Sequence, residues 1–397
     1  MITKAGVLIV GGGIIGLTIA RELVNRGYED IVVVEKEREL GAHASGRNSG
    51  VLHAGVYYTP ESLKARSCLR GNRLLKDYCR SRGIPVKETG KVIVASKEED
   101  LSCLNELFNR AKANGATVEW VSEKELSEIE PAAKTIEKAI YVKETASVDP
   151  KAVLKAISED LQNSGKVKII FGCAFEKLKG SSVAVTSKGE IAFDRFINAA
   201  GSFSDRVAHT FGLAGQYRLV PFKGIYWKLR NDHPLTRSIR GHIYPAPDLR
   251  YPFLGVHFSR NVHDEVFVGP TAIPALGREH YGKIRGIDLE APLIIARNAM
   301  LFISDRSFRN MAFKEPLKYF KSFFYRDAER LVKGLEPEAL LPSSKAGIRP
   351  QLIDISQKKL VMDFLVLKDG NSLHVLNPIS PAFTASMDLA EKIVSMW

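Results

Sequence analysis

The sequence has few cysteines and no long apolar run. Its four cysteines, Cys68, Cys79, Cys103 and Cys173, are scattered without a Cys-x-x-Cys pair, which favours reduced thiols over a disulfide or zinc framework. No stretch of about 18 apolar residues occurs, so no membrane-spanning helix is expected. A glycine-rich motif follows Met1 so closely that we expect no signal or transit peptide. These absences predict a cytoplasmic protein.

Acidic residues are outnumbered by basic ones. The 397 residues include 57 Lys and Arg against 45 Asp and Glu, which gives a net charge of +12. Such an excess either favours anionic partners, such as a dicarboxylate, a phosphorylated cofactor or an anionic membrane surface, or only maintains solubility. The basic residues form no recognisable RNA-binding motif, so no nucleic-acid partner is expected. The length is sufficient for two domain-sized cores.

The most informative motif is at the start of the chain. An apolar run over 7–10 leads into Gly11-x-Gly13-x-x-Gly16 and a helical pattern, and a second apolar strand ends at Glu35. In a dinucleotide site the first glycine makes a tight turn, the second lets the backbone approach a pyrophosphate, and the third lets the helix pack on the strand. The acidic residue then accepts hydrogen bonds from a ribose. The spacing predicts a dinucleotide-binding unit.

Three later segments favour FAD over a nicotinamide cofactor. Residues 45–55 supply glycines and serines for a second pass along a long cofactor. Residues 198–201 (Asn-Ala-Ala-Gly) end an apolar strand, and Ser380-Pro381 is expected to cap and open a final helix whose N–H groups face the flavin. Each feature alone is typical of ordinary strand-to-helix packing, but these three segments, in this order after the strand that ends at Glu35, favour FAD. We expect no metal site, and the residues predicted to bind FAD are Gly11, Gly13, Ile14, Ile15, Gly16, Glu35, Lys36, Ser45, Gly46, Arg47, Ser49, Phe175, Ala199, Ala200, Gly201, Gly347, Arg349, Pro381, Ala382 and Phe383.

The pattern of apolar residues predicts an α/β fold in two parts. Helices are expected over 63–80, 150–163 and within 291–333, with Asp149 as an N-cap before Pro150. Parallel β/α material occurs at the start, near 150–215 and at the end, whereas 221–270 alternates strands and turns like an antiparallel sheet. We therefore expect a discontinuous Rossmann-like FAD-binding domain with an inserted α+β substrate domain. The predicted segments are 1–75, 150–215 and 340–397 for the first, and 76–149 and 216–339 for the second.

Several blocks of sequence resemble a known family of flavoproteins. The chain is similar over nearly its whole length to the D-amino-acid-oxidase-type flavoproteins, and within them to the L-2-hydroxyglutarate dehydrogenase/oxidase family. The blocks that carry the resemblance are Ser45–Tyr58 (SGRNSGVLHAGVYY), Val220–Gly224 (VPFKG), Tyr251–Phe258 (YPFLGVHF), Ala346–Gln351 (AGIRPQ) and Leu373–Ser386 (LHVLNPISPAFTAS).

The resemblance implies the oxidation of a 2-hydroxy dicarboxylate. L-2-hydroxyglutarate would become 2-oxoglutarate as a hydride passes from C2 to flavin N5, with oxygen or a quinone reoxidising the flavin. An alternative is a related flavoenzyme that oxidises an amino acid, an amine or glycerol 3-phosphate, because the LHAGVYY segment also resembles glycerol-3-phosphate dehydrogenases.

A histidine is the expected base for the hydroxyl proton. His53 is the first candidate because it directly follows the predicted flavin-binding stretch, and His257 is the second because it sits on a strand of the predicted substrate domain. His374 also falls in a family block, but its apolar neighbours favour a structural role.

Cationic and phenolic side chains are expected to hold the substrate. Arg349 is the leading candidate because a guanidinium matches a carboxylate in geometry, although it could instead form an ion pair that holds its own loop. Lys223, Tyr58 and Tyr244 are weaker candidates for substrate binding.

Residues 291–333 combine phenylalanines with lysines and arginines. One interpretation is a surface that contacts the cytoplasmic face of a membrane and passes electrons to a quinone. The other is amphipathic packing on the substrate domain with a solvated basic face.

Overall fold

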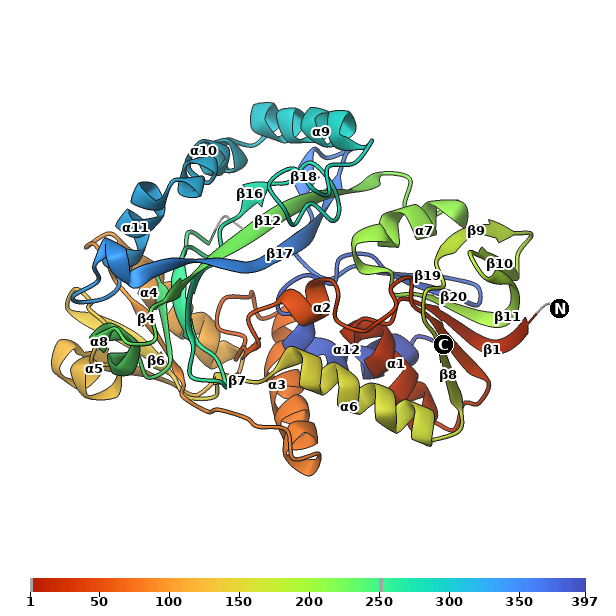
Figure 1. Cartoon of the computed structure of the whole chain (residues 1–397), viewed down its shortest axis with the longest axis horizontal. Helices are drawn as coiled ribbons and strands as arrows, with labels where there is room; N and C mark the ends of the chain where they lie inside the picture. Colours follow the sequence, from red (N-terminus) through yellow and green to blue (C-terminus); the bar gives the residue numbers. More distant parts are fainter. Residues whose placement is uncertain (1–2, 250–252) are drawn as a thin grey trace.

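The computed structural model describes residues 3–249 and 253–397. Tyr251 and Pro252, the first two residues of the block Tyr251–Phe258, lie outside the described residues. Two large sheets organise the described chain, and Figure 1 shows them side by side, with the strands nearest the N-terminus at one end of the molecule.

The first sheet has eight strands in the order β19-β20-β11-β1-β2-β8, with β10 and β9 added beside β11. Its parallel strands are β1 (Thr3–Val10), β2 (Ile31–Val34), β8 (Val167–Ile170), β11 (Gly189–Asn198) and β20 (Ser372–Val375). The antiparallel strands are β9 (Phe175–Lys179), β10 (Val183–Thr186) and β19 (Val366–Asp369).

Both faces of this sheet are covered, which explains why its central strands are continuously apolar. Val7 and Ile9 of β1 belong to the core formed with helices α1 (Ile14–Asn25), α6 (Pro150–Asn163) and α12 (Ala382–Val394). Leu8 and Val10, on the opposite face, belong to a second core that includes Val207 of α7 (Ser204–Thr210). Helix α3 (Leu63–Ser81) packs against α12.

The second sheet has ten strands in the order β18-β17-β12-β15-β14-β13-β4-β6-β5, with β16 beside β12. Its long central pair is β12 (Tyr217–Leu229) and β17 (Leu340–Asp354), which are antiparallel along nearly their whole length. The other strands are β4 (Lys91–Val94), β5 (Val118–Ser122), β6 (Lys138–Val142), β13 (His242–Pro245), β14 (His257–Arg260), β15 (Val266–Gly269), β16 (Ile273–Pro274) and β18 (Lys359–Leu360). β4 and β13 are parallel to each other, and the remaining pairs are antiparallel.

Helices lie on the outside of this sheet. Figure 1 shows α9 (Ala291–Ser304), α10 (Arg306–Lys314) and α11 (Lys321–Glu329) as a chain along one side. The remaining α-helices and strands of the described chain are α2 (Ala44–Arg47), α4 (Asp100–Ala113), α5 (Glu123–Ile129), α8 (Pro234–Ser238) and the short pair β3 (Val51–Leu52) and β7 (Ala146–Ser147). No helix of the described chain has the length and hydropathy needed to cross a bilayer.

The sheet topology suggests two changes to the expected domain boundaries. The boundary at 75 falls inside α3, which runs to Ser81. The boundary at 340 falls at the start of β17, which pairs with β12 of the second sheet. We propose that the first FAD-binding segment extends through α3 and that the last one begins after β18.

Local capping signals predicted one helix start correctly and missed another. Asp149 caps α6 as expected, because its Oδ1 accepts hydrogen bonds from Lys151 N and Ala152 N. The final helix, however, begins at Ala382, with Pro381 in the capping position and no side-chain cap. The expectation that Ser380 caps this helix is wrong, and its hydroxyl instead shares a hydrogen bond with Tyr58.

Candidate active site

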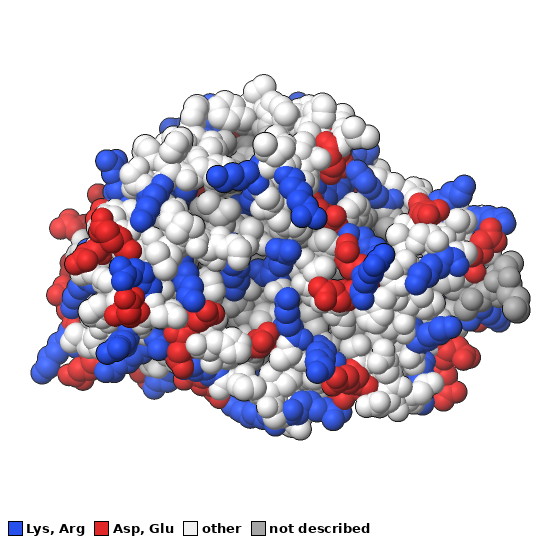
Figure 2. All heavy atoms as spheres, viewed as in Figure 1, with Lys and Arg blue, Asp and Glu red and all other residues white. Residues whose placement is uncertain are grey.

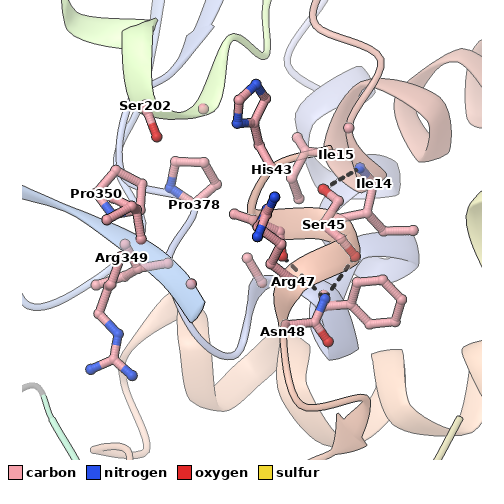
Figure 3. A pocket seen from close by; sticks show the side chains of 18 of the residues that line it. Ile14, Ile15, His43, Ser45, Arg47, Asn48, Ser202, Arg349, Pro350 and Pro378 are labelled. Carbon is pink, nitrogen blue, oxygen red and sulfur yellow. Dashed lines mark hydrogen bonds between the residues drawn. The ribbon is translucent and has the colours of Figure 1, made fainter. Parts of the chain in front are cut away.

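A cavity of about 660 Å³ lies where the two sheets meet. The first sheet and its helices contribute Glu35, Ser45 and Phe175, and the second sheet contributes Tyr244 and His257. Figure 3 shows Ile14, Ser45 and Arg47 on one side of the cavity and Arg349 and Pro350 of β17 on the other. Most of the predicted site residues therefore line one space.

The glycine motif brings three backbone segments into close contact. Gly11 has φ +113°, and a Cβ there would overlap the carbonyl oxygen of Ala199 at the end of β11. A Cβ on Gly16 would overlap Gly11 O, so Gly16 serves the packing of α1 on its strand and does not line the cavity. Gly46, which is also absent from the lining, packs in the same way against Gly41.

The N-terminus of α1 and its neighbours fit the central part of FAD. Ile14 and Ile15 line the cavity, and Ile14 N donates to Ser45 Oγ over 2.9 Å. A Cβ on Gly13 would lie 2.9 Å from the same oxygen, so only glycine leaves this space open. Because first-turn N–H groups have no intrahelical acceptors, such a helix end binds phosphate well. The open space beside Gly13 and Ser45 is therefore suited to a pyrophosphate.

Glu35 is fixed at the end of β2 by two backbone hydrogen bonds. Its Oε2 accepts from Gly12 N and its Oε1 from Glu37 N, each over 2.9 Å. The carboxylate lines the cavity with Phe175 nearby in the lining. This places an oriented acceptor where a ribose would need one, so the donor and acceptor set fits an adenosine group.

A polar cluster borders the cavity near α2. The ammonium of Lys36 contacts Glu37, His43 and Glu279, so these three potential metal-ligating groups are held by a lysine. Arg47 Nε donates to Ala42 O, and the guanidinium carbon lies 4.1 Å from the ring centroid of Tyr281. His43 and Glu279 line the cavity, and the sequence analysis did not identify either of them.

His53 lines the cavity immediately after β3. Its Nδ1 is buried and has no hydrogen-bond partner among the described residues. Burial, followed by the positive charge of Lys91, lowers the pKa of His53 well below its usual value. The ring is therefore neutral near pH 7 and retains a lone pair that can accept a proton.

His257 begins β14 and is buried beside Tyr244. Because Gly255 O can only accept, the 2.8 Å hydrogen bond to His257 Nδ1 makes that nitrogen the donor and leaves Nε2 with the lone pair. Burial lowers the pKa of His257 to about 3, so this ring is also neutral. His374, by contrast, contacts Asn198 and Ser372 within the first sheet and does not line the cavity.

Arg349 projects from β17 into the lining. Its guanidinium carbon lies 4.8 Å from the ring centroid of Phe253, and Figure 3 shows it pointing away from Ser45. Two phenols, Tyr58 and Tyr226, lie close enough to affect its pKa. Tyr226 lines the cavity, whereas Tyr58 lies behind the lining beside Ser380.

Lys223 lies on the other face of its strand. Phe222, Gly224 and Tyr226 of β12 line the cavity, and side chains alternate along a strand. The Lys223 ammonium accordingly donates to Gly282 O, away from the lining. Tyr226 was not predicted, although the same i, i+2 alternation from Gly224 would have indicated it.

The chain is similar to one family of known proteins. A sequence model of the FAD dependent oxidoreductase family (DAO) matches residues 6–394. The L-2-hydroxyglutarate dehydrogenase of Indibacter alkaliphilus is 33% identical, with 96% of each chain covered. The enzyme of the same name from Escherichia coli (strain K12) is 34% identical, with 98% of this chain and 92% of the relative covered.

Solved structures share the fold. A Mycoplasma pneumoniae L-α-glycerophosphate oxidase with FAD bound superposes with a TM-score of 0.79 at 23% identity, covering 100% of this chain and 95% of the other. Glycine oxidase from Geobacillus kaustophilus gives 0.71 at 19% identity, covering 99% and 94%. The predicted α/β FAD-binding fold and the predicted cofactor are confirmed, and the chain belongs to the DAO family of FAD-dependent oxidoreductases.

Proposed function

We propose that this protein oxidises L-2-hydroxyglutarate to 2-oxoglutarate with FAD as its cofactor. The observation that carries the proposal is a neutral histidine, His53, lining the same cavity as the cation Arg349. The identity of 33–36% to L-2-hydroxyglutarate dehydrogenases over nearly the full chain supports this substrate. FAD, when bound, supplies the acceptor for the hydrogen removed from C2 of the substrate.

The residues that would hold FAD lie along the first sheet. Glu35 would accept hydrogen bonds from the ribose, and the N–H groups at the start of α1, with Ser45, would contact the pyrophosphate. Pro381, Ala382 and Phe383 line the cavity at the N-terminus of α12. The partial positive charge of that helix end would stabilise negative charge that develops on the flavin during reduction.

The chain's own residues would bind the substrate and move one proton. Arg349 would pair with a carboxylate and orient the C2 hydroxyl toward His53. His53 would take the hydroxyl proton, and its neutral state at pH 7 leaves a lone pair available. His257 remains the second candidate, because its Nε2 carries a lone pair. Tyr244 would bound the substrate on the side of the second sheet.

The alternative substrates are an amino acid, an amine or glycerol 3-phosphate. A panel of these compounds with L-2-hydroxyglutarate, assayed with an electron-accepting dye, separates the candidates. We expect kcat/KM to be highest for L-2-hydroxyglutarate. Faster turnover of glycerol 3-phosphate or an amino acid would overturn the substrate assignment while leaving the flavin chemistry intact.

We also propose that residues 283–326 contact an anionic membrane surface. Exposed apolar side chains gather there, including Ile284, Leu289, Ile303 and Phe320, which are at least 64% exposed. The exposed charged residues of the segment are all basic: Lys283, Arg285, Arg306, Lys314 and Arg326. Figure 2 shows a mostly white surface over the position of α9 and α10, with blue patches around it.

This pattern suits a peripheral membrane contact. Apolar side chains insert among lipid head groups, and basic residues attract anionic lipids. Phe308 and Phe324 point the other way and are buried in the protein, so the helices also pack amphipathically. A membrane contact favours a quinone over dissolved oxygen as the electron acceptor that reoxidises the flavin.

A further inference from the structure

Lys91, the first residue of β4, is a buried cation without an ion-pair or hydrogen-bond partner among the described residues. Its side chain is almost completely buried, at 1% exposure. The Nζ atom lies 4.5 Å from the ring centroid of Tyr57 and 5.0 Å from that of Tyr244. Buried lysines are rare unless they are paired. The position therefore carries a cost that packing alone does not explain.

The strand pairing puts this ammonium one side chain behind the wall of the cavity. Tyr244, which Lys91 contacts, lines the cavity and stacks on His257 with ring centroids 3.8 Å apart. β4 and β13 are parallel neighbours, and Lys91 is the direct partner of His242 across them. Lys91 therefore lies among the histidines at the substrate end of the site.

The groups around Lys91 come from several elements. Among the described groups that shift the pKa of His53, His242 or His257, none is a carboxylate. The positive charge of Lys91 is the first charge acting on His53 and His242 after burial, and it also acts on His257. Arg349 of β17 adds a second positive charge on His53 and His257. The remaining titratable neighbours, Cys68, Tyr57 and Tyr244, are uncharged at neutral pH.

We propose that Lys91 is a positioning residue of the oxidation site, whose buried ammonium adds to burial in keeping His53 neutral and supplies the counter-charge for a dianionic substrate that lies on the cavity side of Tyr244. This inference rests on the proposed function, because it assigns a role toward a dicarboxylate. Opposite charges attract strongly in a low-dielectric interior, so an ammonium need not touch the substrate to stabilise it.

The proposal predicts coupling between substrate binding and proton uptake. Burial lowers the pKa of Lys91 to about 7, so the free site holds a mixture of charged and neutral lysine near neutral pH. A bound dianion favours the charged form. We therefore expect the complex to take up about half a proton per site near pH 7.

Isothermal titration calorimetry of the oxidised holoenzyme with 2-oxoglutarate measures this uptake directly. The slope of binding enthalpy against buffer ionisation enthalpy gives the number of protons, with no turnover required. We expect uptake by the wild type and none in Lys91→Met, which keeps the side-chain length but removes the charge. Lys76→Met is the matched control, because Lys76 is also buried but is paired with Glu88.

A pH profile gives the second readout. Without the charge of Lys91, the pKa of His53 rises, so the acid limb of kcat/KM should move to higher pH by about one unit. A purely structural lysine would lower activity without moving this limb. The inference is overturned if Lys91→Met leaves both the uptake and the limb unchanged.

Failure of this inference is distinguishable from failure of the proposed function. If the wild type binds 2-oxoglutarate but takes up no proton between pH 7 and 8, the role of Lys91 is wrong, and this result needs no variant to fold. If the holoenzyme neither binds 2-oxoglutarate nor oxidises L-2-hydroxyglutarate, the function itself is wrong.

Discussion

The imidazole of His257 stacks on the phenol ring of Tyr244 at a centroid distance of 3.8 Å and an interplanar angle of 21°. Both residues line the cavity, and both come from short strands of the second sheet. This contact fixes the plane of the imidazole, whose Nδ1 is already held by Gly255 O. His53 lies far from them in the sequence, and its buried Nδ1 has no hydrogen-bond partner in the part of the chain that the structure describes.

This difference predicts unequal effects of replacing the two histidines. We expect His53→Gln to lower kcat by about 10²–10⁴-fold, the usual contribution of a general base. His257→Gln should cost less, because His257 would then serve to hold Tyr244 and not to move the proton. Stopped-flow measurement of flavin reduction tests both, with exposed His263→Gln as the control. A larger loss of kcat from His257→Gln would instead identify His257 as the base.

The second prediction concerns Arg349. Replacing it with Met removes the proposed carboxylate clamp, so KM for L-2-hydroxyglutarate should rise by about 100-fold. Arg349→Lys should recover part of this affinity, because it restores the charge without the fork of N–H donors. Unchanged KM in both variants would show that Arg349 only supports its own loop.

The third prediction separates cofactor binding from folding. Among the described residues, a Cβ at Gly13 meets only Ser45 Oγ, at 2.9 Å. Gly13→Ala should therefore fold normally but lose affinity for FAD by at least about tenfold, because the methyl group occupies the space proposed for the pyrophosphate. Flavin content after purification and circular dichroism give the two readouts. Gly215→Ala is the control, since a Cβ there meets no atom of the described residues within 4 Å.

Stability should fall in mild acid. The pKa of buried His242 and His257 is about 3, and that of His374 is about 4, in each case lowered first by burial. Between those values and 6.5 the unfolded chain binds more protons than the folded one, so the free energy of unfolding decreases as pH falls. We expect a loss of roughly 1–2 kcal/mol per histidine at pH 5 relative to pH 7, measured by urea denaturation. A flat profile would contradict the buried, neutral state.

The membrane proposal predicts binding to vesicles that contain anionic lipid. Leu289→Glu combined with Phe320→Glu should weaken binding by at least about tenfold, because two exposed apolar contacts become charges that the lipids repel. Leu341→Glu, at an exposed apolar residue outside this segment, is the matched control. Binding should also weaken as salt rises. The proposal fails if the wild type does not sediment with anionic vesicles.

The cofactor side of the site was predictable because its constraints are local in sequence. Gly16 is required by its close approach to Gly11 O within one β-α unit, and Glu35 ends the next strand. Gly11 and Gly13 approach Ala199 O and Ser45 Oγ from other segments, but the spacing of the three glycines still indicates them. The cap of α6 by Asp149 is equally local. Ser380 fails as a cap because the helix begins at Ala382, which puts Pro381 and not Ser380 at the capping position.

The substrate side of the site depends on contacts between segments that are distant in the sequence. A single sequence does not show which of these segments are neighbours. Whether a side chain on β12 enters the cavity depends on strand parity, so Phe222 lines it and Lys223 does not. The pairing of β4 with β13 brings Lys91 beside the histidines from about 150 residues away along the chain. Such neighbours become visible only when the sheet is assembled.

The most direct test of the central claim is anaerobic reduction of the bound flavin by the separate enantiomers of 2-hydroxyglutarate, followed by its absorbance. The account predicts that the L enantiomer bleaches the oxidised flavin rapidly and that the D enantiomer does so at least about 100-fold more slowly. Flavin that stays oxidised with L-2-hydroxyglutarate, or that both enantiomers reduce equally well, would contradict it.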